Sequence, residues 1–159
     1  MNNELRKTNR YPGRLLYKKS QNLLGEWPKI LGEMEELKRL LPSLEFAHSF
    51  ISFHFFGEDE NSPHGLIEGE VGREVIGPIL PGQVMDKEFQ VRDSLEKPLV
   101  VLEGQLPFDF SFKYLKEIVE EMKSSFQGEL EKSWTVGIDF SQNKGKDSKL
   151  PYKIEIAFK

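Results

Sequence analysis

The sequence predicts an α+β domain, with a mostly antiparallel sheet of about five to seven strands and two main helices packed on it. Two segments, one in each half of the chain, carry apolar residues at helical spacing. Short runs rich in β-branched and aromatic residues follow each of them, separated by glycine and proline. The chain has 159 residues, an ordinary size for one domain, so we expect a single core.

The first 25 residues are predicted to be a basic arm, followed by one domain over residues 26–159. Residues 1–20 carry a net charge of +5, whereas residues 21–140 carry −12. Pro12-Gly13 is a turn signal, and no long apolar period accompanies the charges. We expect the apolar residues of the arm to dock on the body, because their burial stabilises more than exposed charge pairs do.

Residues 28–41 and 111–126 are the two predicted helices. Pro28 suits the first turn of a helix, where its missing N–H costs little. Asp109 or Ser111 can cap the second helix. Each helix has one apolar stripe that we expect to pack on the sheet: Ile30, Met34, Leu37 and Leu41 in the first, and Leu115, Ile118, Val119, Met122 and Phe126 in the second.

Residues 44–56 form the longest strand candidate. Apolar side chains fall on both of its faces, which is typical of a central strand covered on two sides. The last strand, 152–158, alternates apolar residues with Lys153, Glu155 and Ala157. The remaining candidates are 66–71, 74–80, 84–92, 98–103 and 134–140. We find no internal repeat in the sequence.

The chain contains no cysteine, which excludes disulfides, thiolate metal sites and cysteine nucleophiles. No segment has the run of roughly 18 apolar residues that a membrane span requires, and the N-terminal residues lack the apolar region of a secretory signal. We therefore expect a cytoplasmic protein with no membrane contact.

The three histidines are the first candidates for metal binding or acid–base chemistry. His48 and His54 share a face of the predicted strand, but six residues at about 3.3 Å each separate them by roughly 20 Å, too far for one metal. We expect His48 to be a hydrogen-bonded core residue. His54 and His64 flank a polar loop, and their spacing fits no metal signature. We predict no metal, no cofactor and no catalytic residue.

Two other patterns are better explained by structure than by chemistry. Glu68 and Glu70 alternate onto one strand face, and a solvent-facing sheet edge accounts for them better than a catalytic carboxylate pair. Gly69 and Gly72 lie in a strand context among glutamates, which favours turns over a phosphate cradle.

The preferred function is a non-enzymatic protein-binding module: an acidic inhibitor or immunity-type partner, or a small subunit of a larger assembly. The expected partner is a basic protein or further copies of this chain, because the body is strongly acidic. The same negative charge argues against nucleic acid. The residues expected to bind the partner are the acidic loop residues Glu58, Asp59 and Glu60 and the arm residues Arg6, Lys7 and Arg10.

The alternative is a small-molecule-binding or hydrolytic domain with an aromatic pocket between the sheet and the helices. Aromatic clefts with a few polar groups are common ligand sites. His54 or His64 would supply the polar group, and the expected aromatic lining is Phe50, Phe53, Phe55 and Trp134.

Overall fold

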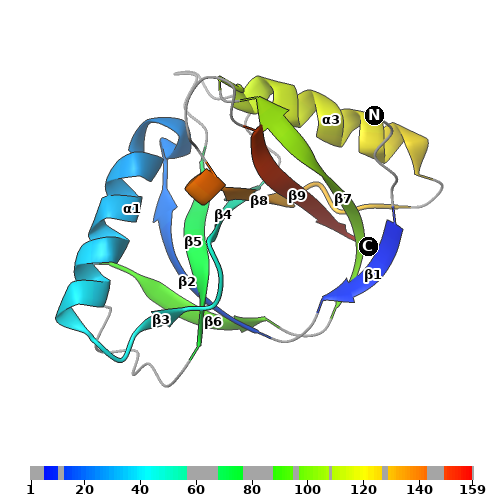
Figure 1. Cartoon of the computed structure of the whole chain (residues 1–159). Helices are drawn as coiled ribbons and strands as arrows, with labels where there is room; N and C mark the ends of the chain where they lie inside the picture. Colours follow the sequence, from blue (N-terminus) through cyan, green and yellow to red (C-terminus); the bar gives the residue numbers. More distant parts are fainter. Residues whose placement is uncertain are drawn as a thin grey trace.

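The computed structural model describes residues 6–10, 13–56, 68–76, 88–94, 97–107, 109–126, 129–142 and 149–158. They form a curled antiparallel sheet with two helices on the outside of the curl (Figure 1). The strands are β1 (Arg6–Arg10), β2 (Gly13–Ser20), β3 (Glu45–Phe46), β4 (Phe50–Phe55), β5 (Gly69–Ile76), β6 (Gln90–Ser94), β7 (Lys97–Pro107), β8 (Trp134–Asp139) and β9 (Lys149–Ala157). The helices are α1 (Leu23–Leu40) and α3 (Phe112–Ser125), and a 3₁₀ turn, η2 (Phe140–Gln142), follows β8.

The predicted α+β class is confirmed, but the predicted strand number is too low. The described residues form a nine-stranded sheet in the order β1-β7-β9-β8-β4-β5-β2-β6, with β3 paired to β5. Two of the additional strands, β1 and β2, lie in the segment predicted to be an arm. Leu16 and Tyr17 are consecutive and both buried, so β2 lacks the alternation that identifies a half-buried strand.

Strand β2 is an integral part of the sheet. It pairs with β5 on one side and with β6 on the other, and Leu16 is fully buried in the core. Helix α1 begins at Leu23, because Asn22 caps it by accepting a hydrogen bond from the Gly25 N–H at 3.3 Å. The helix therefore runs across residue 25, the predicted end of the arm, and Pro28 lies inside it rather than in its first turn.

The predicted central strand is confirmed, since β4 lies between β5 and β8. In contrast, the two predicted strands 66–71 and 74–80 are replaced, in the described part of the chain, by the single strand β5. Gly72 lies within β5 because β2 approaches there: a Cβ on Gly72 would stand 2.4 Å from the Leu16 carbonyl oxygen. This glycine marks a close approach of two strands and not a turn.

The same succession of elements occurs twice in the chain. Strand, helix, strand, strand describes both β2-α1-β4-β5 and β7-α3-β8-β9, apart from the two-residue β3. Strand pairing repeats as well, with the order β2-β5-β4 in one unit and β7-β9-β8 in the other. The two units meet where β4 pairs with β8. The repeat is thus one of topology, which the sequence does not reveal.

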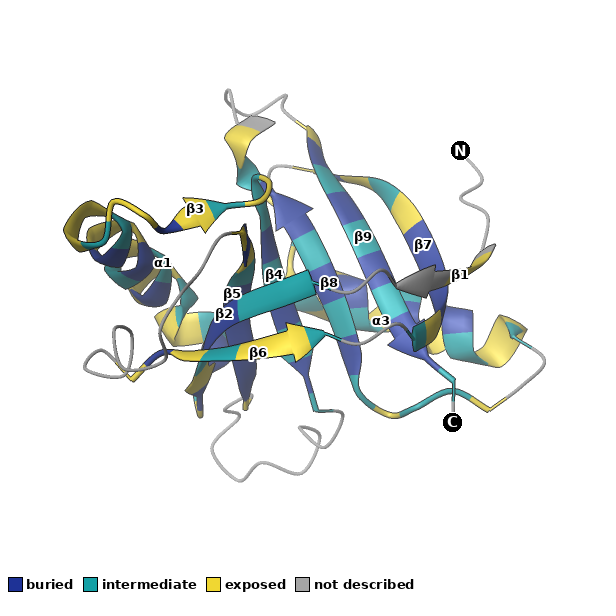
Figure 2. Ribbon diagram, turned by 90° about the horizontal axis from the view of Figure 1, so that it is seen from below, coloured by how far each residue is buried: buried dark blue, intermediate teal, exposed yellow. Residues whose placement is uncertain are grey.

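A two-stranded ribbon links the two edges of the curled sheet. Arg10 pairs with Lys97 on one side of the break between β1 and β2, and Gly13 pairs with Ser94 on the other, so both sets of pairs share one register. We call β1, β2, β6 and residues 97–101 of β7 the crossing ribbon. Figure 2 shows β6 and β1 lying in front of the central strands, on the face opposite the helices.

Alternation along β4 divides its side chains between the two faces of the sheet. Phe53 and Phe55 are buried in the core on the helix side, where Phe53 contacts Trp27 and Phe112 with ring centroids 5.5 and 5.3 Å apart. Phe50, Ser52 and His54 face the inside of the curl. The core therefore lies between the sheet and the helices, and the inner face of the sheet is available for a site.

Candidate ligand-binding site

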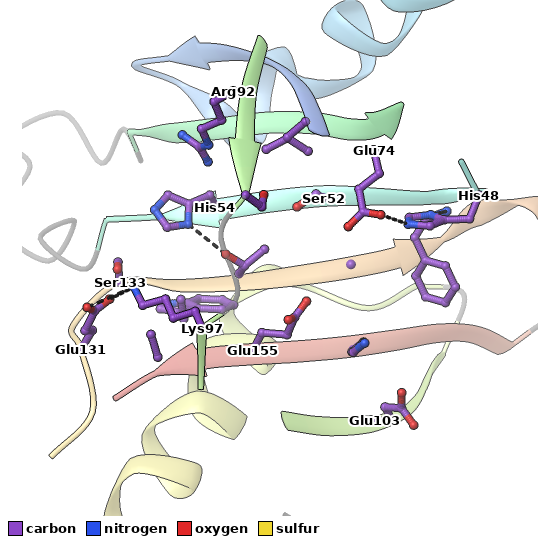
Figure 3. Close-up of a pocket in the computed structure, with 18 residues that line it drawn as sticks. His48, Ser52, His54, Glu74, Arg92, Lys97, Glu103, Glu131, Ser133 and Glu155 are labelled. Atoms are coloured by element: carbon purple, nitrogen blue, oxygen red, sulfur yellow. Dashed lines mark hydrogen bonds and ion pairs between the residues drawn. The ribbon is translucent and has the colours of Figure 1, made fainter. Parts of the chain in front are cut away.

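A cavity of about 410 Å³ lies on the inner face of the sheet, between the central strands and the crossing ribbon (Figure 3). Its position follows from the curl, because the crossing ribbon covers a face that the helices do not. The volume falls within the range of small-molecule sites. Both aromatic and charged side chains line it. They include Phe50, Trp134, His48, His54, Glu74, Glu103, Glu131, Glu155, Arg92, Lys97 and Lys153.

His48 and Glu74 form one end of the cavity. The Nε2 atom of His48 lies 3.1 Å from Glu74 Oε2, and its Nδ1 atom accepts a hydrogen bond from the Phe50 N–H at 3.2 Å. Since Nδ1 is an acceptor, Nε2 carries the hydrogen and donates a hydrogen bond to the Glu74 carboxylate. The His48 side chain is 43% exposed, so the prediction of a core histidine is wrong. It lies in the segment 47–49 that precedes β4, where the predicted strand is interrupted.

Asp139 lies behind this end of the cavity and is 7% exposed. Burial disfavours its charged form and raises the pKa of this carboxyl, but hydrogen bonds from the Ser141 hydroxyl, the Ser141 N–H and the Ser49 side chain outweigh that effect, with help from nearby His48. The pKa of Asp139 consequently lies below its ordinary value.

We expect Asp139→Asn to be less stable than the wild type at neutral pH and to lose this disadvantage in acid. A carboxyl whose pKa is lowered by folding stabilises the protein above its unfolded-state pKa, and that contribution disappears as the pH falls through the folded-state pKa. Urea denaturation of both proteins between about pH 7 and pH 3 measures the difference. A difference in stability that stays constant over this range contradicts the assignment.

The middle of the cavity contains His54, Thr135 and Glu155 from three neighbouring strands. Thr135 is the cross-strand partner of both His54 on β4 and Glu155 on β9. The His54 Nδ1 and Thr135 Oγ1 atoms lie 2.9 Å apart, which fixes the orientation of the imidazole. Glu155 is half-buried and faces the cavity (Figure 3).

Arg92 and Lys97 form the other end. Arg92 Nη2 lies 2.9 Å from Glu70 Oε1, an ion pair without a well-aligned hydrogen bond. Glu70 is 3% exposed, so its predicted place on a solvent-facing edge is wrong: β2 covers the side of β5 that would have been an edge. Lys97 Nζ lies 3.3 and 3.4 Å from the carboxylate oxygens of Glu131.

Three of the six residues predicted for the alternative pocket line this cavity. They are Phe50, His54 and Trp134, and Trp134 also stacks on Phe55 with ring centroids 4.4 Å apart. Phe53 and Phe55 lie on the opposite face, in the core, because the cavity is on the side of the sheet away from the helices. His64 lies outside the described residues.

Of the residues predicted to bind a protein partner, the structure describes only those of the arm. Glu58, Asp59 and Glu60 lie outside the described residues. Arg6, Lys7 and Arg10 belong to β1, which pairs with β7. The Lys7 ammonium lies over the rings of Phe126 and Phe158, 5.4 and 5.8 Å from their centroids.

The charged residues of the cavity were missed, although the sequence contained a signal for some of them. Lys153, Glu155 and Ala157 are the residues that alternate with the apolar face of β9, and all three line the cavity. A charged strand face normally indicates solvent. Here the crossing ribbon lies over it, which only the tertiary structure reveals.

The described residues contain no group of three histidine, aspartate or glutamate side chains close enough to hold a metal ion. Neither described helix has the length and hydropathy needed to span a membrane.

Comparison by sequence finds no matching family model and no matching curated protein. Comparison by structure finds the EcmrR C-terminal domain, with a TM-score of 0.75 and 10% identity over 100% of this chain and 99% of that chain. SAV2435 bound to tetraphenylphosphonium matches with a TM-score of 0.59 and 12% identity, over 100% of this chain and 94% of that chain. At such low identity the similarity establishes the fold alone.

The third match corrects a prediction. A cryo-electron microscopy structure of an EcmrR–DNA complex matches with a TM-score of 0.73 and 9% identity, over 99% of this chain and 58% of that chain. The expectation that nucleic acid is an unlikely partner is contradicted by this likeness to a protein found in a complex with DNA. The negative net charge of the body was the basis of that expectation.

Proposed function

We propose that this chain is a small-molecule-binding domain, and that its ligand is an organic molecule with an aromatic part and a positively charged group. The observation that carries the proposal is the cavity of about 410 Å³ on the inner face of the sheet. Phe50 offers aromatic surface, Trp134 lines the cavity beside it although its ring is largely buried against Phe55, and Glu155 offers a carboxylate in the middle of the cavity. Aromatic rings and a half-buried carboxylate together favour organic cations. The fold shared with SAV2435, which binds tetraphenylphosphonium, supports the same class of ligand.

The other functions considered from the sequence have less support. The inhibitor hypothesis rests on the charge of the body and on the loop Glu58 to Glu60, and that loop lies outside the described residues. Hydrolysis would require an activated nucleophile, and the contact between His54 and Thr135 is a hydrogen bond within the sheet between two paired strands. We therefore propose binding rather than catalysis.

Tetraphenylphosphonium is a suitable probe, and the two tryptophans of the chain make the test specific. Trp134 lines the cavity, whereas Trp27 packs on Phe53 and Phe140 at the helix side. We expect saturable binding that changes the emission of Trp27→Phe, where Trp134 is the remaining reporter. The emission of Trp134→Phe should not respond. Calorimetric titration without saturable heat, together with an unchanged Trp134 signal, contradicts the proposal.

The carboxylate can be tested separately. Glu155→Gln should weaken binding of the cation about tenfold, or about 1.4 kcal/mol, because it removes the central negative charge and keeps the shape. Glu117→Gln is the matched control, since this exposed residue of α3 lies outside the cavity and carries the same charge. Equal affinities of the two variants would show that the Glu155 carboxylate does not contribute to binding of the positively charged ligand.

A further inference from the structure

Arg92 is held in a fixed position at one end of the cavity. Its guanidinium stacks on the ring of Tyr17, with Cζ 4.3 Å from the centroid, and forms an ion pair with the buried Glu70. Tyr17 is itself fixed, because its hydroxyl donates a hydrogen bond to Gln90 Oε1 at 2.7 Å. The guanidinium is thus oriented by groups on β2, β5 and β6 before any ligand binds.

The ion pair with Glu70 involves only part of the Arg92 guanidinium. A guanidinium has five N–H donors in a rigid fork, and Glu70 contacts one nitrogen atom. The Arg92 side chain is 41% exposed and lines the cavity, whereas Glu70 is buried and is not part of the lining. The exposed side of the fork is therefore directed away from Glu70, and Figure 3 shows Arg92 extending from β6 on the same side of the cavity as His54.

Other hydrogen-bond donors surround this end of the cavity. Ser94 and Ser133 line it with Lys97, whose ammonium is bound to Glu131. The acidic side chains near Arg92 are thus paired with cations: Glu70 with Arg92 and Glu131 with Lys97. A preoriented guanidinium beside hydroxyl donors is the arrangement that recognises a carboxylate.

We propose that the ligand also carries an acidic group, a carboxylate or an anion of similar shape, that binds to Arg92. The ligand is then an aromatic zwitterion, with its positive group near Glu155 and its acidic group at the crossing ribbon. This inference rests on the proposed function, because it names the chemical class of the molecule in the same cavity.

Rhodamine 110 and rhodamine 123 test the inference, because they differ in one group: the first has a free carboxylate and the second its methyl ester. We expect the intact protein to bind rhodamine 110 about tenfold to a hundredfold more tightly, as measured by fluorescence anisotropy. Equal affinity, or tighter binding of the ester, overturns the assignment of the acidic group and leaves the proposed function standing. Absence of binding by both dyes and by tetraphenylphosphonium overturns both proposals.

The double variant Arg92→Gln with Glu70→Gln tests whether the guanidinium causes the preference for rhodamine 110. Both charges of the ion pair are removed, so no buried charge is left unpaired. This variant should bind both dyes with the affinity that the intact protein has for the ester. The control is Arg14→Gln with Asp93→Asn, which removes an exposed ion pair of the same ribbon outside the cavity and should keep the preference. A preference that survives in the Arg92 double variant overturns the inference.

Arg92→Lys is the second variant, in case the double variant does not fold. It keeps the positive charge beside Glu70 but loses the fork, so the preference for rhodamine 110 over the ester should fall severalfold. An unchanged preference in Arg92→Lys contradicts recognition by the guanidinium fork.

Discussion

Replacing Phe53 with alanine is expected to lower the free energy of unfolding by about 3 to 5 kcal/mol, the usual range for removing a buried phenylalanine ring. Phe53 is fully buried on the helix side of the central strand β4. Its ring contacts Trp27 of α1, Phe112 of α3 and Phe140 of η2, so the cavity left by truncation lies where three elements meet. Chemical denaturation followed by circular dichroism measures the change.

Tyr114→Ala is the control for this prediction. Tyr114 lies on α3 but is 46% exposed, so its truncation should change stability by less than about 0.5 kcal/mol. Similar losses in the two variants would mean that Phe53 is not at the centre of the core. Because Phe53 points away from the cavity, Phe53→Ala should also bind the ligand under all conditions in which the variant is folded.

Deleting residues 1–20 is expected to abolish cooperative folding. The deletion removes β2, which pairs with β5 and β6 and carries the buried residue Leu16. It would leave an inner strand of the sheet without a neighbour, a far larger loss than that of exposed ion pairs. Thermal unfolding followed by circular dichroism tests this, and the loss should persist at about 0.5 M salt, where charges more than about 4 Å apart are screened.

Deleting residues 1–12 provides the comparison. That shorter deletion removes β1, an edge strand paired only with β7, and leaves β2 in place. We expect a folded protein of reduced stability. If the protein without residues 1–20 has the melting temperature of the intact chain, residues 26–159 form the domain by themselves, as the sequence predicts.

The predictions from sequence succeeded where the periodicity is strong and local. The stripe Leu115, Val119 and Met122 identifies α3, and Ser111 caps it by accepting a hydrogen bond from the Tyr114 N–H. These features involve residues three or four positions apart, so the chain specifies them without reference to the rest of the molecule. The same holds for the alternation that identifies β9.

The predictions failed where the outcome depends on a neighbour distant in sequence. Strand β2 carries consecutive buried residues among lysines, and it becomes a strand because β5 and β6 flank it. The sequence around Gly72 predicts a turn, but in the structure the Leu16 carbonyl oxygen lies where a Cβ of residue 72 would clash with it. In both cases the deciding contact joins residues more than 50 positions apart.

The sequence by itself determined the α+β class, the two helices and the apolar face of β9, because these follow from the spacing of side chains along the backbone. Only the tertiary structure decided which face carries the site. Glu155 and Lys153 alternate with the core residues of β9, as residues facing solvent would. They line a cavity instead because the sheet curls and the crossing ribbon spans its inner face. Curl and closure are properties of nine strands together, and no local pattern in the chain encodes them.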